Sequence, residues 1–291
     1  KEDSPLHAET AVVCIDDAWG QRLAAMLPHP FTVSTEAASE HDASLQPDVW
    51  AGPSSVMDNG MQTAELYGFG ANGMTLHIPM PGRFNVANAM LAMGLLVKTG
   101  MKAEDAIEGL STVTVPGRLE RIDCGQDFMA VVDYAHKPAA IAAVLDTLRG
   151  QLEGTKGRVG IVVGAGGDRD SSKRPIMGAA AASRADLTVV TDDNPRSEDP
   201  ATIRAAVMAG AREAAPQGDI REVGSRARAI DEVVDWAEPG DAVIVVGKGH
   251  EVGQLVNGKT LHFDDREEMA RAIEEKLAGT PHRDTLGDAK E

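Results

Sequence analysis

Residues 158–196 read RVGIVVGAGGDRDSSKRPIMGAAAASRADLTVVTDDNPR, and this stretch decides the fold class. The apolar run at 159–163, like a second one at 243–246, is continuous rather than alternating, as in strands covered on both faces of a parallel sheet. Residues 173–183 are typical of a helix, and they lie between the strand expected at 158–163 and another expected at 187–191. A strand, a helix and a second strand in this order predict a right-handed βαβ unit.

The same alternation extends outward in both directions from this stretch. Asp199 and Ser225 are good N-caps for the helices that follow them, and Pro200 suits a first helical position. We expect an α/β fold with a doubly wound, mostly parallel, Rossmann-like sheet. Its further elements are strands at 128–133, 219–223 and 242–246 and helices at 138–149, 200–213, 226–236 and 265–277.

The pattern changes around residues 113–118, where we place a domain boundary. The first domain, 1–115, has a strand at 11–15, a helix at 19–27 and short β-like pieces between 31 and 78. A turn and helix at 82–98 and a helix at 103–110 follow. The second domain is 116–279, and 280–291 is a polar tail that we expect to be loose.

The composition narrows the class of protein. The chain has 291 residues, and its 28 Lys and Arg against 45 Asp and Glu give a net charge of −17. This acid excess argues against nucleic acid or an anionic membrane as the main partner. No apolar run approaches the roughly 20 residues of a membrane span, and no signal-peptide pattern is present. Cys14 and Cys124 suit a reducing cytosol, so we expect a cytoplasmic protein.

The chain begins at Lys1 rather than with Met. Either its N-terminus was processed or the sequence starts inside a larger protein, and composition does not choose between these two origins.

Polar residues gather where the predicted strands of the second domain end. These clusters are 133–138, 164–175, 192–196 and 247–251. Because ligands of open α/β sheets bind beyond the carboxyl ends of the strands, we expect the clusters to line one pocket. Arg169 and Arg196 can hold a carboxylate, and Asp193 and Glu251 can receive an ammonium group. The sequence therefore indicates a site for a zwitterionic amino acid.

Each cluster taken alone has a plainer explanation. Residues 164–167 can be a tight strand-to-helix turn, and no Gly-Lys-Ser or Gly-Lys-Thr follows them to make a phosphate-binding Walker loop. Residues 193–195 have the composition of a turn. Residues 248–251 can be an ordinary polar loop, and His136 a satisfied loop histidine. Four such explanations at adjacent strand ends are less economical than one pocket.

Two further candidates lie outside these clusters. Asn85 and Asn88 share one face near the start of the 82–98 helix. Either Asn85 caps the helix and Asn88 lies on the surface, or both side chains contact a nucleotide. Arg118 stands alone at the domain boundary, where a salt bridge is the usual role.

Taken together, these residues resemble the MurE family of Mur ligases over about 11–277. The resemblance rests on Asp-Tyr-Ala-His at 133–136, Gly-Gly-Asp-Arg-Asp at 166–170 with Lys173 and Arg174, Asp-Asn-Pro-Arg at 193–196 and Gly-Lys-Gly-His-Glu at 247–251. Members add the third residue of the peptidoglycan stem peptide to UDP-MurNAc-L-Ala-D-Glu, using ATP and Mg²⁺ through an acyl phosphate. In that family, Asp-Asn-Pro-Arg marks enzymes that select meso-diaminopimelate over L-lysine.

The resemblance implies roles for individual residues. Arg196 would pair with the carboxylate that lysine lacks, and Arg118 would act near the ATP phosphates as the catalytic residue. Asp133 would lie near the ribose, with His136 in the same motif, and the two asparagines would contact the nucleotide. The residues expected to line the diaminopimelate site are Arg169, Asp193, Asn194, Pro195, Arg196, Gly247 and Glu251.

The resemblance also implies that the chain is a fragment. Residues 1–115 match only the later part of the family's central ATPase domain, so we expect the Walker loop and the Mg²⁺ ligands upstream of Lys1. We expect the chain to be a monomer and to be inactive by itself. Competing interpretations are a Mur-superfamily ligase for another amino acid, such as a lysine-adding or folylpolyglutamate-type enzyme, and a non-catalytic amino-acid-binding module.

Overall fold

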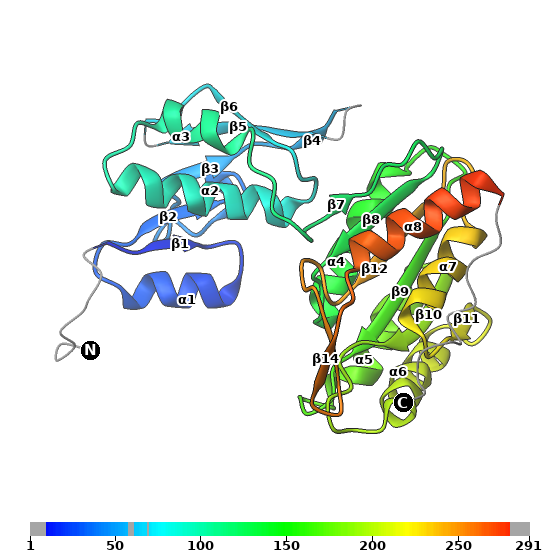
Figure 1. Ribbon diagram of the computed structural model, residues 1–291. Coiled ribbons are helices and arrows are strands. Elements are labelled where there is room, and N and C mark those ends of the chain that lie inside the picture. The colour runs from blue at the N-terminus through cyan, green and yellow to red at the C-terminus, as the bar shows by residue number, and fades with distance from the viewer. Residues whose placement is uncertain (1–9, 58–60, 69, 280–291) are drawn as a thin grey trace. The chain divides into compact units, whose positions relative to one another are not determined.

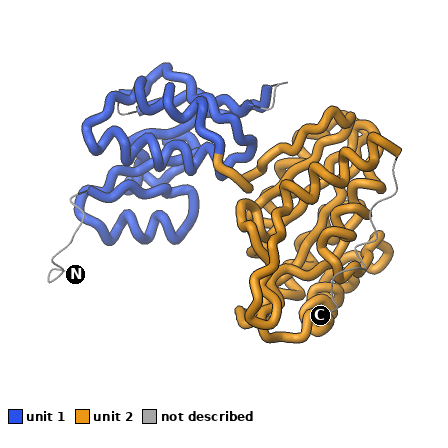
Figure 2. The backbone as a smooth tube through the Cα atoms, viewed as in Figure 1, with its two compact units in different colours: residues 1–114 blue, residues 115–291 orange. Residues whose placement is uncertain are grey.

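The computed structural model describes residues 10–57, 61–68 and 70–279, so the predicted tail at 280–291 lies outside the described residues. The chain divides into two compact units, Lys1–Thr114 and Val115–Glu291 (Figure 2). Each unit has its own sheet and its own apolar core.

The first unit is built on a mixed sheet with the strand order β1-β2-β3-β5-β4, and β6 pairs with β5 (Figure 1). Strands β1, β2 and β3 are parallel, and the pairings of β5 are antiparallel. The strands are β1 Val12–Cys14, β2 Phe31–Ser34, β3 Val49–Ala51, β4 Ser55–Val56, β5 Gln62–Gly68 and β6 Met74–Ile78. The helices are α1 Ala18–Met26, the short 3₁₀ helix Ala38–Glu40, α2 Arg83–Lys98 and α3 Ala103–Leu110.

Helix α2 covers the first sheet closely. Its buried residues Met90 and Met93 pack in one cluster with Val33 of β2 and Leu76 of β6. A Cβ added to Gly94 would lie 2.8 Å from Cγ1 of Val12, so a glycine lets the helix approach β1. This close approach holds the later part of α2 against the amino ends of β1 and β2.

The second unit contains the predicted doubly wound sheet, with the strand order β11-β10-β9-β12-β8-β7. All its pairs are parallel except β7 with β8. The strands are β7 Glu120–Arg121, β8 Met129–Asp133, β9 Val159–Ala165, β10 Leu187–Asp192, β11 Asp219–Glu222 and β12 Ala242–Val246. The helices are α4 Pro138–Gln151, α5 Lys173–Ala182, α6 Pro200–Ala214, α7 Arg226–Trp236 and α8 Asp265–Ala278.

The strand order determines which face each helix covers. Strands β8 to β11 step across the sheet in one direction, so right-handed crossovers place α4, α5 and α6 on one face. The chain then returns from β11 to β12, which places α7 on the other face beside α8 (Figure 1). Strands β9 and β12 are buried along their whole length, which confirms the prediction made from their continuous apolar runs.

The predicted elements of the second domain agree with the structure to within two residues at each end. The side chains of Asp199 and Ser225 accept hydrogen bonds from their helices, as their N-cap assignments require. Three short strands were not predicted: β7 and the antiparallel hairpin of β13 Gln254–Val256 and β14 Lys259–Leu261. These strands have two or three residues and are not buried, so they lack an apolar pattern.

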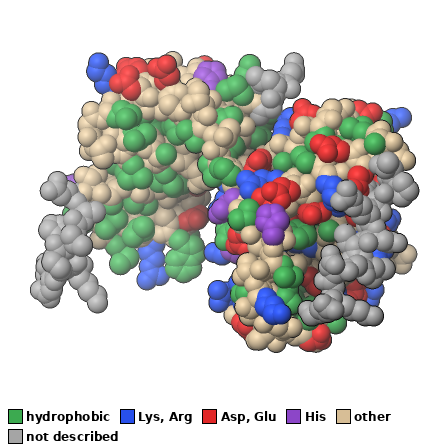
Figure 3. All heavy atoms as spheres, viewed as in Figure 1, with side chains coloured by type: hydrophobic (Ala, Val, Ile, Leu, Met, Phe, Trp, Pro, Cys, Tyr) green, Lys and Arg blue, Asp and Glu red, His purple; other side chains and the backbone are tan. Residues whose placement is uncertain are grey.

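The visible surface of the second unit mixes charges of both signs. Figure 3 shows its acidic and basic side chains interspersed rather than gathered in patches of one sign. Among the described residues, no helix has both the length and the apolar character of a membrane span.

Candidate functional site

The structure brings together the loops that follow β9, β10 and β12. The amide of Gly167 donates to the carbonyl oxygen of Asn194 at 2.9 Å. A Cβ on Gly167 would lie 1.9 Å from the carbonyl oxygen of Pro195, and a Cβ on Gly247 would lie 2.7 Å from Oδ2 of Asp193. These three loops can approach so closely because glycine occupies the points of contact. The loops after β9, β10 and β12 therefore lie in contact at the carboxyl edge of the sheet, as predicted.

Charged side chains join the loop after β9 to the loop after β10. Asp168 accepts hydrogen bonds from the hydroxyl and the amide of Ser197. These hydrogen bonds hold the pKa of the Asp168 carboxyl below its usual range. Glu198 in turn accepts from the buried guanidinium of Arg174 at 2.8 Å and from the Asp168 amide. The two loops are thus held as one polar rim.

Arg196 reaches across this rim. Its NH1 donates to the carbonyl oxygen of Gly167 at 2.7 Å, and its backbone adopts the left-handed conformation with φ +56°. Within the part of the chain that the structure describes, its Nε and NH2 groups have no hydrogen-bond partner. This free edge of the guanidinium has the geometry that binds a carboxylate in a bidentate manner.

Acceptors for an ammonium group lie on the loops after β10 and β12. Asp193 is 7% exposed, and its Oδ1 lies 3.5 Å from the ammonium nitrogen of Lys248. Glu251 is half-buried and accepts from Nδ2 of Asn194 at 3.3 Å. Gly247 has φ +117°, a conformation that suits glycine. The loops that carry Arg196 therefore also supply carboxylate acceptors for an ammonium group.

The remaining predicted residues of this site differ in exposure. Pro195 is buried between the loops. Arg169 is exposed, and its only hydrogen bond within the described residues is a long one of 3.4 Å, from NH1 to the carbonyl oxygen of Asp168. Its guanidinium is available to solvent or to a ligand.

Sequence reasoning missed the contribution of the β13–β14 hairpin. Gln254 donates from its side chain to the carbonyl oxygen of Asp193 at 2.7 Å, and the amide of Leu255 donates to Oδ1 of Asn194 at 2.9 Å. The amide of Arg196 donates to the carbonyl oxygen of Leu255 at 3.0 Å. The Asn257-Gly258 dipeptide, a strong hairpin signal, was the available clue.

This hairpin contains a sequence pattern that sequence reasoning overlooked. We expected the Walker loop upstream of Lys1, yet residues 253–260 read Gly-Gln-Leu-Val-Asn-Gly-Lys-Thr and match the G-x-x-x-x-G-K-T pattern. The structure folds them as two antiparallel strands with a turn at Asn257 and Gly258. A phosphate-binding loop joins a strand to a helix N-terminus, so the match is one of sequence only.

The residues predicted for ATP in the second unit surround Tyr134. The guanidinium of Arg118 lies 4.6 Å from the centre of the Tyr134 ring, and the His136 ring packs against the same tyrosine at 4.7 Å. Asp133 is buried, and its two oxygens accept from the amides of Leu119 and Ala135 at 2.8 and 2.7 Å. Burial raises the pKa of Asp133, and the two amides and Arg118 oppose that rise.

Asn85 and Asn88 belong to the first unit, near the start of α2. Asn85 is buried and donates to the carbonyl oxygen of Pro81 at 2.9 Å, whereas Asn88 is exposed. The cap residue of α2 is Gly82, so the capping explanation for Asn85 does not hold.

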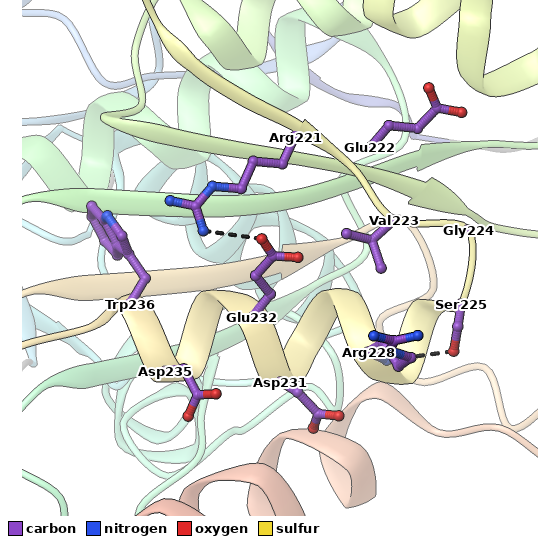
Figure 4. A pocket seen from close by; sticks show the side chains of 10 residues that line it. All are labelled: Arg221, Glu222, Val223, Gly224, Ser225, Arg228, Asp231, Glu232, Asp235 and Trp236. Atoms are coloured by element: carbon purple, nitrogen blue, oxygen red, sulfur yellow. Dashed lines mark hydrogen bonds and ion pairs between the residues drawn. The ribbon is translucent and has the colours of Figure 1, made fainter. Parts of the chain in front are cut away.

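A separate cavity of about 800 Å³ runs along α7 and the edge strand β11, and it contains none of the predicted site residues. Figure 4 shows Arg221 and Glu232 facing one another across it, 3.0 Å apart, while Asp231 projects from another side of α7. The described residues gather no group of three or more His, Cys, Asp or Glu side chains placed to hold a metal ion.

Comparison with protein families matches both units. Residues 117–249 match the family described as "Mur ligase, glutamate ligase domain", and residues 3–96 match "Mur ligase middle domain". Together the two matches cover well over half of the chain.

Several curated proteins are similar to the chain. One from Corynebacterium glutamicum, named UDP-N-acetylmuramoyl-L-alanyl-D-glutamate–2,6-diaminopimelate ligase, is 53% identical over 95% of the chain and 52% of its own length. A protein of the same name from Streptomyces coelicolor is 43% identical over 93% of the chain and 52% of its own length. The chain thus spans about half the length of these relatives.

Solved structures show the same fold. A structure of UDP-N-acetylmuramoyl-L-alanyl-D-glutamate–2,6-diaminopimelate ligase aligns with TM-score 0.56 and 30% identity, over 92% of this chain and 53% of that one. Folylpolyglutamate synthase from Mycobacterium tuberculosis, complexed with ADP and AMPPCP, aligns with TM-score 0.62 and 20% identity, over 96% and 57%. The second likeness concerns the fold alone.

Proposed function

The chain belongs to the Mur ligase family, and on this premise we propose that it carries the amino-acid site of an enzyme that adds meso-diaminopimelate to UDP-MurNAc-L-Ala-D-Glu. The observation that carries the proposal is the free guanidinium edge of Arg196. It belongs to the loop whose Asp193 and Asn194 contact Lys248 and Glu251 of the loop after β12. Diaminopimelate differs from lysine by one carboxylate, and Arg196 offers two free donors to it.

We propose the following use of the site. One end of diaminopimelate binds with its carboxylate on Arg196 and its ammonium on Glu251, the more exposed of the two acceptors. Asp193, already close to Lys248, adds negative charge beneath it. Arg169 is available for a second carboxylate. L-Lysine has no carboxylate for the Arg196 guanidinium. Its binding is therefore disfavoured, because the guanidinium would lose hydrogen bonds to water without gaining any to the ligand.

The proposed reaction is amide formation through an acyl phosphate. The terminal phosphoryl group of ATP is transferred to the D-Glu carboxylate, which yields ADP. The diaminopimelate amine, after losing a proton, attacks the carbonyl carbon, the carbon–oxygen bond to phosphate breaks, and inorganic phosphate leaves. Preorganised cationic groups stabilise charge on a transferring phosphoryl group, and we assign this role to Arg118.

We propose that Asp133 acts on this step by holding Arg118 in place. Its bond to the Leu119 amide fixes the backbone beside the arginine, and Leu119 itself has φ +44°. A position near the ribose remains a prediction for Asp133, as do nucleotide contacts for His136, Asn85 and Asn88. Mg²⁺ would supply charge neutralisation to the phosphates, but we assign none of the described residues to it and derive no step through it.

We further propose a cytoplasmic monomer. The free thiols of Cys14 and Cys124 support a reducing compartment. Burial raises the pKa of Cys14 to about 11, which keeps that thiol protonated and unreactive. Sedimentation velocity at micromolar concentration tests the monomer.

The proposed function is tested with a polypeptide of the relatives' length that contains this chain. ADP release and product mass would be followed with UDP-MurNAc-L-Ala-D-Glu, with and without meso-diaminopimelate. We expect ADP and a product heavier by one diaminopimelate residue only when all substrates are present. ADP release that does not depend on the amino acid, or no product of that mass, would contradict the proposal.

A further inference from the structure

Lys248 is a fully buried cation beneath the proposed diaminopimelate site. Its side chain is 0% exposed, so its ammonium group is shielded from solvent. It donates to Oδ1 of Asn194 at 2.9 Å and to the carbonyl oxygen of Gly253 at 2.7 Å. Burial lowers the pKa of Lys248, and the negative charge of Asp193 opposes that effect. A buried charge is stable only where hydrogen bonds and opposite charges compensate it. The role of Lys248 can therefore be inferred from its contacts with Asn194, Gly253 and Asp193.

The partners of Lys248 settle the orientation of the Asn194 side chain. An ammonium group can only donate, and the amide of Leu255 also donates to the same Asn194 atom at 2.9 Å. Two donors on one side require the carbonyl oxygen of the amide to face them. The amide nitrogen must then face outward, where it contacts Glu251.

Asn194 in turn joins the loop that carries Arg196 to the hairpin. The Arg196 amide donates to the carbonyl oxygen of Leu255, and the Asn257 amide donates to the carbonyl oxygen of Arg196. These bonds hold Arg196 in its left-handed backbone conformation, which an arginine adopts only when its surroundings impose it. The contact of Lys248 with Asn194 thus supports the junction between the loop of Arg196 and the β13–β14 hairpin.

We propose that Lys248 is a positioning residue for amino-acid selection, which presents the Asn194 amide to Glu251 and holds the loop of Arg196 against the hairpin. This inference rests on the proposed function. Lys248 does not touch the ligand. It acts through Asn194, so its loss should change the affinity and the selectivity of the site more than the stability of the fold.

Lys276 supplies a matched control. It is a partly buried lysine of the same unit, its pKa is also lowered by burial, and its ammonium group donates to the carbonyl oxygens of Val234 and Ala237. It lies in the last turn of α8 and contacts none of the site loops through these bonds. Lys248→Met and Lys276→Met therefore each remove one ammonium group and leave its backbone carbonyl acceptors without that donor.

The first measurement is amide hydrogen exchange, read by NMR at Arg196 and Leu255. We expect exchange at both amides to be at least tenfold faster in Lys248→Met than in the unaltered chain, and unchanged in Lys276→Met. Lys248→Gln keeps a donor without the charge, should give an intermediate rate, and replaces Lys248→Met if that variant does not fold. Unchanged protection in a folded Lys248 variant would overturn the inference.

The second measurement is calorimetric binding of meso-diaminopimelate and L-lysine to the same variants. We expect Lys248→Met to weaken diaminopimelate binding at least tenfold and to reduce its preference over lysine, while Lys276→Met stays within twofold. Faster exchange with unchanged affinity would also overturn the inference. If the unaltered chain binds no diaminopimelate, the proposed function fails, whereas the exchange data still decide whether Lys248 holds the loop.

Discussion

Replacement of Arg196 by alanine should remove most of the preference for meso-diaminopimelate over L-lysine. The free Nε and NH2 edge of Arg196 is the group that would bind the additional carboxylate. Alanine is also a non-glycine residue, so the cost of the left-handed backbone at this position is the same in both proteins. The substitution therefore mainly removes the guanidinium.

The expected magnitude follows from the bonds that are lost. A hydrogen bond to a charged group contributes about 1.5–3 kcal/mol, and 1.4 kcal/mol corresponds to a tenfold change in affinity. Loss of the carboxylate contact should therefore weaken diaminopimelate binding by about 10- to 150-fold. L-Lysine has no carboxylate at that end, so its affinity should change less than threefold, on the order of 0.6 kcal/mol.

The assay is titration calorimetry of both amino acids with the unaltered chain, Arg196→Ala and the control Arg212→Ala. Arg212 is an exposed residue in the last turn of α6. Thermal melting of each variant would separate a binding defect from the loss of the hydrogen bond between Arg196 and Gly167. Diaminopimelate affinity that survives in Arg196→Ala, or an equal loss for both amino acids, would refute the reasoning.

Three further predictions follow from the contacts described. Gly167→Ala places a Cβ against the carbonyl oxygen of Pro195, so we expect a loss of about 1–3 kcal/mol in unfolding free energy and weaker diaminopimelate binding, whereas Gly150→Ala should be neutral or stabilising. Urea unfolding and calorimetry would check both variants. Asp264 caps α8, and its hydrogen bonds with Arg266 hold the pKa of its carboxyl below the usual 3.8. The ionised Asp264 carboxylate stabilises the fold fully above pH 3.8, and this contribution is lost as the pH falls through the lowered pKa. Asp264→Ala should therefore reduce the free energy of unfolding by about 1 kcal/mol at pH 7 and by less towards pH 2. An equal loss at both pH values in urea unfolding would contradict this. The chain by itself should release no ADP above background in a coupled assay, because its Gly-Lys-Thr lies in a hairpin; turnover with diaminopimelate would disprove this.

The fold was predictable where burial produces a recognisable apolar pattern in the sequence. The strands at 159–163 and 242–246 are covered on both faces, so they are apolar throughout, and helices with Asp199 and Ser225 as caps separate the strands around them. The hairpin of β13 and β14 escaped prediction because its residues are half-buried or exposed. Only the Asn257-Gly258 dipeptide could have indicated it.

The sequence predicted which loops lie close together but not the hydrogen bonds that join them. Parallel strands end at one edge, which brought Asp193, Arg196 and Glu251 together as expected. Nothing local in the sequence distinguishes Lys248, which is buried under the site, from an exposed lysine in a polar loop. The role of Gln254 likewise depends on a contact between residues 61 positions apart. Long-range packing decides such roles, and a single sequence does not contain it.

A competition assay tests the central claim most directly. A polypeptide of the relatives' length that contains this chain would receive ATP, UDP-MurNAc-L-Ala-D-Glu and equal concentrations of meso-diaminopimelate and L-lysine, and the products would be identified by mass spectrometry. The account predicts the diaminopimelate product in at least tenfold excess, in line with about 1.4 kcal/mol or more of discrimination. Equal amounts of the two products, or an excess of the lysine product, would contradict it.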